Sequence, residues 1–207
     1  MLRLLVCLAS LLLPWMLRPS LAYISCGFRG KASSRLFSTA EKPRDEHFMR
    51  LALRHAQFAF REKEIPVGAV LVDEHGRVLA AARNSVETFK DATAHAEVAV
   101  MRKAAQMLGN WRLVDCTLYT TLEPCAMCFS AAQSFRIRRL VYGAFDKRLG
   151  ALGSWVDLTS QPHPFHKVEV TGGVLEEEAS TLLRRFFQLR RREKQTGETS
   201  TDEWLKD

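Results

Sequence analysis

The chain has 207 residues, among them 30 basic and 23 acidic side chains, and its formal net charge is +7. This length suits one domain with a short extension and can bury a sizeable hydrophobic core. Five of the basic residues lie in an acid-free stretch over positions 1–40, so the remainder carries a net charge of only +2. The charge therefore does not by itself indicate a nucleic-acid-binding protein, and five cysteines do not describe a disulfide scaffold.

Positions 1–40 have the composition of a targeting segment. A basic residue precedes an apolar run over 4–13, and Ser20-Leu21-Ala22 is a small-residue cleavage site, so 1–22 is predicted to be signal-peptide-like. Positions 23–40 are rich in serine and basic residues, which is typical of a transit peptide. This bipartite presequence predicts delivery to a plastid, with no membrane segment in the mature form. A mitochondrial presequence and plain secretion are the alternatives.

The first elements of the domain follow this presequence. Apolar residues recur at helical spacing from about 45 to 63, which predicts an amphipathic helix. Two short apolar runs, 67–72 and 77–82, flank the turn-rich Asp73-Glu74-His75-Gly76 and predict a β-hairpin.

After a loop over 84–91, strands and helices alternate. The further predicted elements are helices over 94–108, 125–134 and 176–192 and strands over 114–121, 139–144 and 167–171. This order predicts an α/β fold, a three-layer α/β/α sandwich with a mixed central sheet of about five strands. The domain is expected to span 45–193, and the polar residues 195–207 are expected to form a disordered tail.

Two short motifs carry the chemistry, His95-Ala96-Glu97 and Pro124-Cys125-Ala126-Met127-Cys128. Cysteines three apart share one face of a helix, and one histidine with two thiolates leaves the fourth position of a zinc ion for water. His95 and Glu97 are two apart, so both face one site only if a helix begins there. A redox pair or half of a structural zinc site are the alternatives for Cys-x-x-Cys alone, but no second such pair exists.

The chain resembles the bacterial-type tRNA adenosine deaminases (TadA) within the cytidine-deaminase fold. The resemblance covers roughly 45–193 and rests on five blocks that include and extend the two motifs. These blocks are Glu64-Ile65-Pro66-Val67-Gly68-Ala69-Val70, 91–97, 118–128, Arg136-Ile137-Arg138-Arg139-Leu140-Val141-Tyr142-Gly143-Ala144 and Gly150-Ala151-Leu152-Gly153-Ser154. It implies zinc-dependent conversion of the wobble adenosine of tRNA anticodons to inosine, by a homodimer with one zinc ion per subunit.

Residue by residue, the resemblance implies that zinc is held by His95, Cys125 and Cys128 and that Glu97 moves protons. It also implies Asn84 as a polar contact to the base, Asp146 near the anticodon nucleotides, and an apolar pocket wall made of Ile65, Val67 and Leu122. Two departures stand out: Ala92 where the family usually has proline, and Phe129-Ser130 where a Gly-Ala pair is common. We expect the first to loosen the loop before His95 and the second to disturb dimer packing.

Two other functions remain open, a deaminase of free cytosine, guanine or cytidine and a non-catalytic tRNA-binding subunit. Free-base enzymes generally share only the zinc motifs, and a non-catalytic subunit should lack Glu97, so both are less favoured. Two basic clusters bear on RNA binding, one formed by Arg136, Arg138, Arg139, Lys147 and Arg148 and one on the last predicted helix. In the second, Arg190, Arg191 and Arg192 are predicted to contact RNA phosphates, although such clusters are often only a solvated face.

Overall fold

The computed structural model describes residues 41–161, 163–197 and 201–205. Its helices are α1 (Glu41–Arg61), α2 (Val86–Phe89), α3 (Ala96–Leu108), α4 (Ala126–Ser134), α5 (Glu176–Thr196) and α6 (Thr201–Leu205). Its strands are β1 (Gly68–Val72), β2 (Val78–Arg83), β3 (Thr117–Leu122), β4 (Arg139–Ala144) and β5 (Glu169–Thr171). The predicted targeting segments over 1–40 lie outside the described residues.

The five strands form one mixed sheet in the order β2-β1-β3-β4-β5. β1 is antiparallel to both of its neighbours, whereas β3, β4 and β5 are mutually parallel. The register pairs Gly68 with Arg83 and Leu122 with Ala144. The amino end of β1 and the carboxyl ends of β2, β3 and β4 therefore meet at one edge of the sheet.

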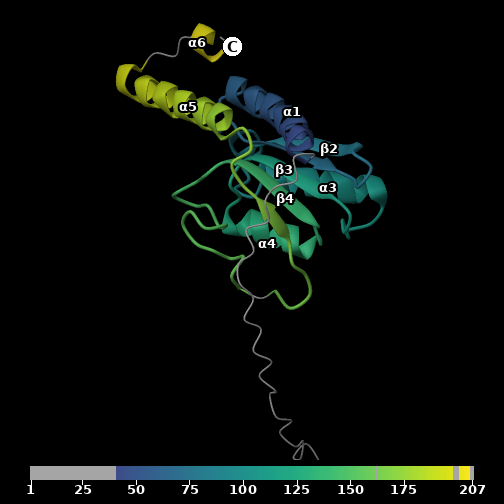
Figure 1. Ribbon diagram of the computed structural model, residues 1–207. Coiled ribbons are helices and arrows are strands. Elements are labelled where there is room, and N and C mark those ends of the chain that lie inside the picture. Colours follow the sequence, from purple (N-terminus) through teal and green to yellow (C-terminus); the bar gives the residue numbers. More distant parts are fainter. Residues whose placement is uncertain (1–40, 162, 198–200, 206–207) are drawn as a thin grey trace, which may run out of the picture. The chain divides into compact units, whose positions relative to one another are not determined.

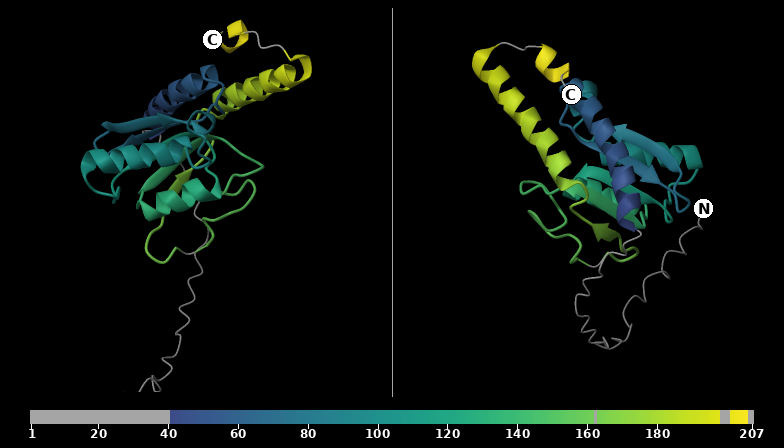
Figure 2. Two further views of the ribbon diagram at one scale, coloured as in Figure 1. Left: turned by 180° about the vertical axis from the view of Figure 1, so that it is seen from behind. Right: turned by 45° about the horizontal axis from the view of Figure 1, so that its top comes forward.

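Helices cover both faces of this sheet, so the predicted three-layer α/β/α sandwich is confirmed. α1 and α5 lie on one face and α3 and α4 on the other (Figure 1), and the view from behind shows the same arrangement (Figure 2). Each face has its own hydrophobic cluster, the larger one under α3 and α4. At Gly68 the backbone of α1 comes so close that a Cβ atom would lie 2.1 Å from the Ala52 carbonyl oxygen. Only glycine fits there.

A buried ion pair fastens the start of α1 to the sheet. The Arg139 guanidinium donates to both carboxylate oxygens of Asp45, at 2.8 and 2.7 Å, and the Tyr119 hydroxyl donates to the same carboxylate at 2.9 Å. The side chains of Asp45 and Arg139 are only 3% and 13% exposed. Arg139 belongs to the basic cluster that could contact RNA, but its side chain is mostly buried and holds this ion pair.

The predicted elements are all present, with ends that shift by a few residues. α1 begins four residues earlier than predicted and α5 ends four later, whereas β3 begins three later. α2 and α6 were not predicted. α6 lies within the expected disordered tail, but its Trp204 is 2% exposed and packs against Phe60 and Phe186, with ring centroids 5.1 and 5.5 Å apart. Burial of one large aromatic side chain orders this short segment.

Candidate active site

The predicted site residues lie at the sheet edge where four strand ends meet. Ile65 and Val67 precede β1, Asn84 follows β2, Leu122 ends β3, and Asp146 lies two residues beyond β4. Because β1 runs antiparallel to β3, its amino end lies beside the carboxyl end of β3. Residues from separate parts of the sequence therefore gather around one point.

The motif residues His95 and Cys125 are the N-cap residues of α3 and α4. Both have extended backbones, with φ −72° and ψ 148° at His95 and φ −71° and ψ 170° at Cys125, and neither side chain caps its own helix. The helical turn that follows carries Glu97 in α3 and Cys128 in α4. Two helix N-termini thus face the site, where their partial positive charge favours thiolates and other anions.

The structure brings the three predicted metal ligands together. The Nδ1 atom of His95 lies 3.7 Å from the Cys125 Sγ and 3.4 Å from the Cys128 Sγ, and the three ligand atoms all lie within 4.8 Å of one another. Around tetrahedral zinc, bond lengths of about 2.3 Å to sulfur and 2.0 Å to nitrogen give ligand separations of roughly 3.5–3.8 Å. The donor set and its spacing fit a zinc ion.

The departure from the family pattern at Ala92 does not leave the loop before His95 unsupported. The Asp91 carboxylate accepts hydrogen bonds from both the backbone N–H (2.8 Å) and the hydroxyl (2.7 Å) of Thr93. The backbone N–H of Ala94 also donates to the Asp91 carbonyl oxygen. The bonds from Thr93 lower the pKa of Asp91, and all three hold the turn that leads into α3.

Contacts within the site shift the pKa values of its two cysteines and of Glu97. Hydrogen bonding to Cys128 lowers the pKa of Cys125 to about 4, and the same contact together with burial raises the pKa of Cys128. Zinc binds cysteine as thiolate, so metal binding displaces any proton that these two sulfur atoms carry. Burial raises the pKa of Glu97, which is 4% exposed and does not belong to the three-residue ligand cluster. Glu97 is therefore a buried carboxyl group outside the ligand cluster, and a group of this kind suits proton transfer.

A cavity of about 350 Å³ opens onto these groups. His95, Glu97 and Cys125 form part of its wall. All five residues that the resemblance implied as substrate contacts line it as well, namely Ile65, Val67, Asn84, Leu122 and Asp146. A larger groove of about 610 Å³ between α1 and α5 shares no lining residue with this cavity and contains none of the metal ligands. The smaller cavity is the candidate active site.

Several wall residues were missed by the sequence analysis. The buried carboxylates of Glu64 and Glu123 belong to the wall, and so do Phe145, Leu183 and Phe187. The remaining missed residues are Val86, Glu87, Arg148 and Leu149. Glu64 directly follows three charged residues, so its local sequence does not indicate burial, and which face of α5 turns toward the site depends on the packing of that helix.

Glu123 holds the loop that follows β4. Its carboxylate accepts backbone hydrogen bonds from Asp146 (3.1 Å), Leu152 (2.9 Å) and Ser154 (3.2 Å). A Cβ atom on Gly150 would lie 2.4 Å from the carboxyl carbon of Glu123, so the loop closes tightly around this side chain. The buried Glu123 carboxylate therefore holds the part of the cavity wall that contains Asp146.

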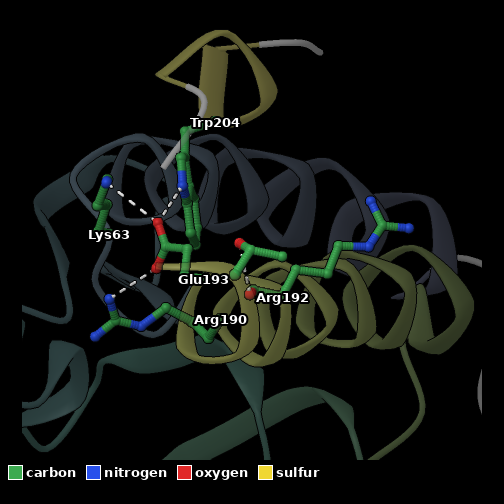
Figure 3. Close-up of polar contacts among 6 residues, drawn as sticks. Lys63, Arg190, Arg192, Glu193 and Trp204 are labelled. Carbon is green, nitrogen blue, oxygen red and sulfur yellow. Dashed lines mark hydrogen bonds and ion pairs between the residues drawn. The ribbon is translucent and has the colours of Figure 1, made fainter. Parts of the chain in front are cut away.

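The predicted RNA-contacting arginines lie near the end of α5, outside the walls of the active-site cavity. Arg190 pairs with Glu193 at 3.3 Å, and Arg192 pairs with Glu203 of α6 at 3.7 Å. Figure 3 shows that the Glu193 carboxylate accepts hydrogen bonds from Arg190, from Lys63 and from the Trp204 indole N–H. The Arg192–Glu203 pair is exposed on both sides and contributes about 0–1 kcal/mol, so Arg192 can leave it for a phosphate, whereas the Glu193 side chain that holds Arg190 is only 16% exposed.

Comparison with known proteins agrees with this site. Residues 42–144 match the model of the family described as the cytidine and deoxycytidylate deaminase zinc-binding region. A tRNA-specific adenosine deaminase from Agrobacterium fabrum is 48% identical over 145 residues, which cover 70% of this chain and 95% of the relative. A chloroplastic tRNA(adenine(34)) deaminase from Arabidopsis thaliana is 46% identical over 162 residues, but the match covers only 12% of that longer protein.

Among solved structures, one from a study of A-to-I editing by tRNA:A34 deaminases at the wobble position of transfer RNA superposes with a TM-score of 0.64. It is 48% identical in sequence, and the match covers 66% of this chain and 99% of the other.

Proposed function

The chain belongs to the cytidine and deoxycytidylate deaminase family, in its branch of tRNA-specific adenosine deaminases, and we propose that it converts adenosine 34 of a tRNA anticodon to inosine. The reaction is hydrolytic: adenosine and water give inosine and ammonia. The observation that carries this proposal is one cavity lined by two of the metal ligands, His95 and Cys125, by the buried Glu97, and by the five residues that the resemblance implies as substrate contacts.

The proposed catalytic roles are supported by the arrangement of the metal-ligand cluster and Glu97 in one site. His95, Cys125 and Cys128 would hold zinc, which when bound acidifies a water molecule and so supplies the nucleophile. Glu97 would take up a proton from the attacking water and deliver it to the substrate, so that the exocyclic amine leaves as ammonia. Burial raises the pKa of Glu97, which favours the protonated form of this carboxyl group relative to an exposed one and so suits proton transfer.

The cavity walls fit a purine base. Ile65, Val67 and Leu122 offer apolar surface to the ring, and Asn84 offers hydrogen bonds to its edge. Arg148, whose guanidinium lies over the Phe187 ring at 5.3 Å, adds positive charge at the wall. An anticodon loop suits this site because its bases are already splayed, which lowers the cost of extruding one of them.

The enzyme is further proposed to act as a homodimer. The Phe129-Ser130 departure does not argue against this state, because Phe129 is 1% exposed and belongs to the hydrophobic cluster under α3 and α4. Of these two residues only the small Ser130 is exposed. Light scattering of the purified protein tests the proposal, and a monomeric mass at micromolar concentration would contradict it.

Positions 1–40 are proposed to direct the protein to a plastid, with 1–22 acting first as a signal sequence. The relative from Arabidopsis is named as chloroplastic, which supports this destination over a mitochondrion. Within the part of the chain that the structure describes, no helix combines the length and apolar character needed to cross a membrane. A fluorescent reporter fused to 1–40 should reach the plastid, whereas a fusion to 1–22 should enter only the secretory route.

The activity is tested by incubating the full chain with an anticodon stem-loop that carries adenosine at position 34 and sequencing the RNA for A-to-G changes. A matched stem-loop with its adenosine moved outside the wobble position should stay unedited. Glu97→Ala should retain zinc but lose turnover by a factor of about 10²–10⁴ or more, because the carboxylate moves protons and does not ligate the metal. Metal loss in this variant would overturn the role of Glu97.

The same assay separates the two other functions. Release of ammonia from free cytosine, guanine or cytidine, with the stem-loop unedited, would identify a free-base deaminase. Binding of the stem-loop by zinc-loaded wild-type protein without any editing would identify a non-catalytic RNA-binding subunit.

A further inference from the structure

Glu64 is a buried carboxylate in the cavity wall that the proposed mechanism does not use. It is 1% exposed, and among residues 41–161, 163–197 and 201–205 no basic side chain forms an ion pair with it. Its Oε2 atom accepts a hydrogen bond from Asn84 Nδ2 at 3.0 Å. Its Oε1 atom accepts two from Thr88, one from the backbone N–H at 2.6 Å and one from the hydroxyl at 2.9 Å. A buried charge without a counter-ion is costly, so its retention calls for a reason.

The contact with Asn84 fixes the orientation of an amide that lines the cavity. An ionised carboxylate can only accept hydrogen bonds, so Asn84 must turn its NH₂ group, not its oxygen, toward Glu64. The backbone N–H of Asn84 also donates to the Val67 carbonyl oxygen at 2.9 Å. Hydrogen bonds thus hold both the backbone and the side chain of Asn84. The NH₂ group and the oxygen of its carboxamide therefore have one fixed orientation relative to the cavity.

We propose that Glu64 is a positioning residue that sets which edge of the Asn84 carboxamide faces the base. The proposal rests on the proposed function, in which Asn84 contacts the substrate. A preset amide discriminates between bases, because a base whose donor and acceptor pattern is reversed would leave a buried polar group unpaired.

The variant Glu64→Gln isolates this role, since it keeps the size of the side chain. The atom that faces the Thr88 backbone N–H must remain an oxygen, because that N–H can only donate. The new amide nitrogen therefore takes the place of Oε2 and points its hydrogens at Asn84. Asn84 then has to turn its oxygen toward this nitrogen, which exchanges the donor and the acceptor offered to the base.

The experiment is a double-mutant cycle in the full chain, with Glu64→Gln, Asn84→Ala and both together, measured as kcat/KM per zinc-loaded protein on the adenosine-34 stem-loop. Each single variant should lower kcat/KM by roughly 5- to 150-fold, the range for an unpaired buried polar group. The double variant should lie within about twofold of Asn84→Ala, because Glu64 acts through Asn84. The Kd for the stem-loop should stay the same in all three variants, because none of them changes a residue proposed to contact RNA phosphates.

Glu62→Gln is the matched control. It removes the same charge two residues away, where Glu62 pairs with Arg83 at the surface and lies outside the cavity wall. Its kcat/KM should stay close to wild type. If Glu64→Gln instead lowers kcat/KM equally with and without Asn84, or acts only by lowering the zinc content or the Tm, Glu64 is a structural residue and the proposal is wrong.

Failure of the proposed function would look different. In that case wild-type protein leaves the stem-loop unedited, and the same cycle is measured on the free nucleobase or nucleoside that it deaminates. Because Glu64 acts on Asn84 and not on the RNA, the same non-additivity is expected there, and additive effects would refute the positioning role.

Discussion

The ion pair between Asp45 and Arg139 offers a quantitative test of how the fold is held. Asp45→Asn keeps the size of the side chain but removes the negative charge that pairs with the Arg139 guanidinium, which is 13% exposed and also donates to the Thr171 hydroxyl. Removing one partner of a buried pair costs about 3–5 kcal/mol, and we expect the lower end because asparagine still accepts one hydrogen bond. For a domain of this size about 3 kcal/mol corresponds to a fall in Tm of roughly 6–12 °C.

The measurement is thermal unfolding of the zinc-loaded protein, with Glu62→Gln as the control. The Glu62–Arg83 pair has equally short contacts of 2.6 Å, but its side chains are 44% and 38% exposed. Such surface pairs contribute about 0–1 kcal/mol, so the control should change the Tm little. Equal shifts in the two variants would refute the reasoning, because the expected difference rests on the burial of the Asp45–Arg139 pair and on the hydrogen bond that Asp45 accepts from Tyr119.

The remaining predictions concern the site and its substrate. Cys128→Ser should lower the zinc content and the Tm, because a hydroxyl is a weak zinc ligand; full metal occupancy would remove Cys128 from the site. Gly150→Ala should lower kcat/KM and the Tm, because its Cβ atom would lie 2.4 Å from the Glu123 carboxyl carbon, and unchanged kinetics would show that the loop can shift freely. Neutralising the arginines at 190–192 should weaken tRNA binding and reduce the log–log salt slope by roughly one unit per lost phosphate contact, with turnover at saturating tRNA unchanged. An unchanged slope would make these arginines ordinary surface residues.

Local patterns in the sequence were enough to predict the layers of the fold and the metal ligands. Helical and strand periodicities are local, so α3, α4 and the five strands could be predicted within a few residues. His95, Cys125 and Cys128 could be predicted as one group because one histidine and two cysteines three apart suit a zinc site, and Glu97 could be added because it faces the same site only if a helix begins at His95. The structure shows those starts, with His95 and Cys125 as N-cap residues.

The closure of the substrate cavity, by contrast, depends on tertiary packing. The roles of Glu64 and Glu123 depend on which donors surround them, and these donors come from segments 20 to 31 residues away in the sequence. The same holds for Leu183 and Phe187, which enter the wall because α5 packs beside the sheet edge. Periodicity predicts that a side chain is buried, but the partner it meets depends on the mixed strand order, which brings four distant strand ends to one point.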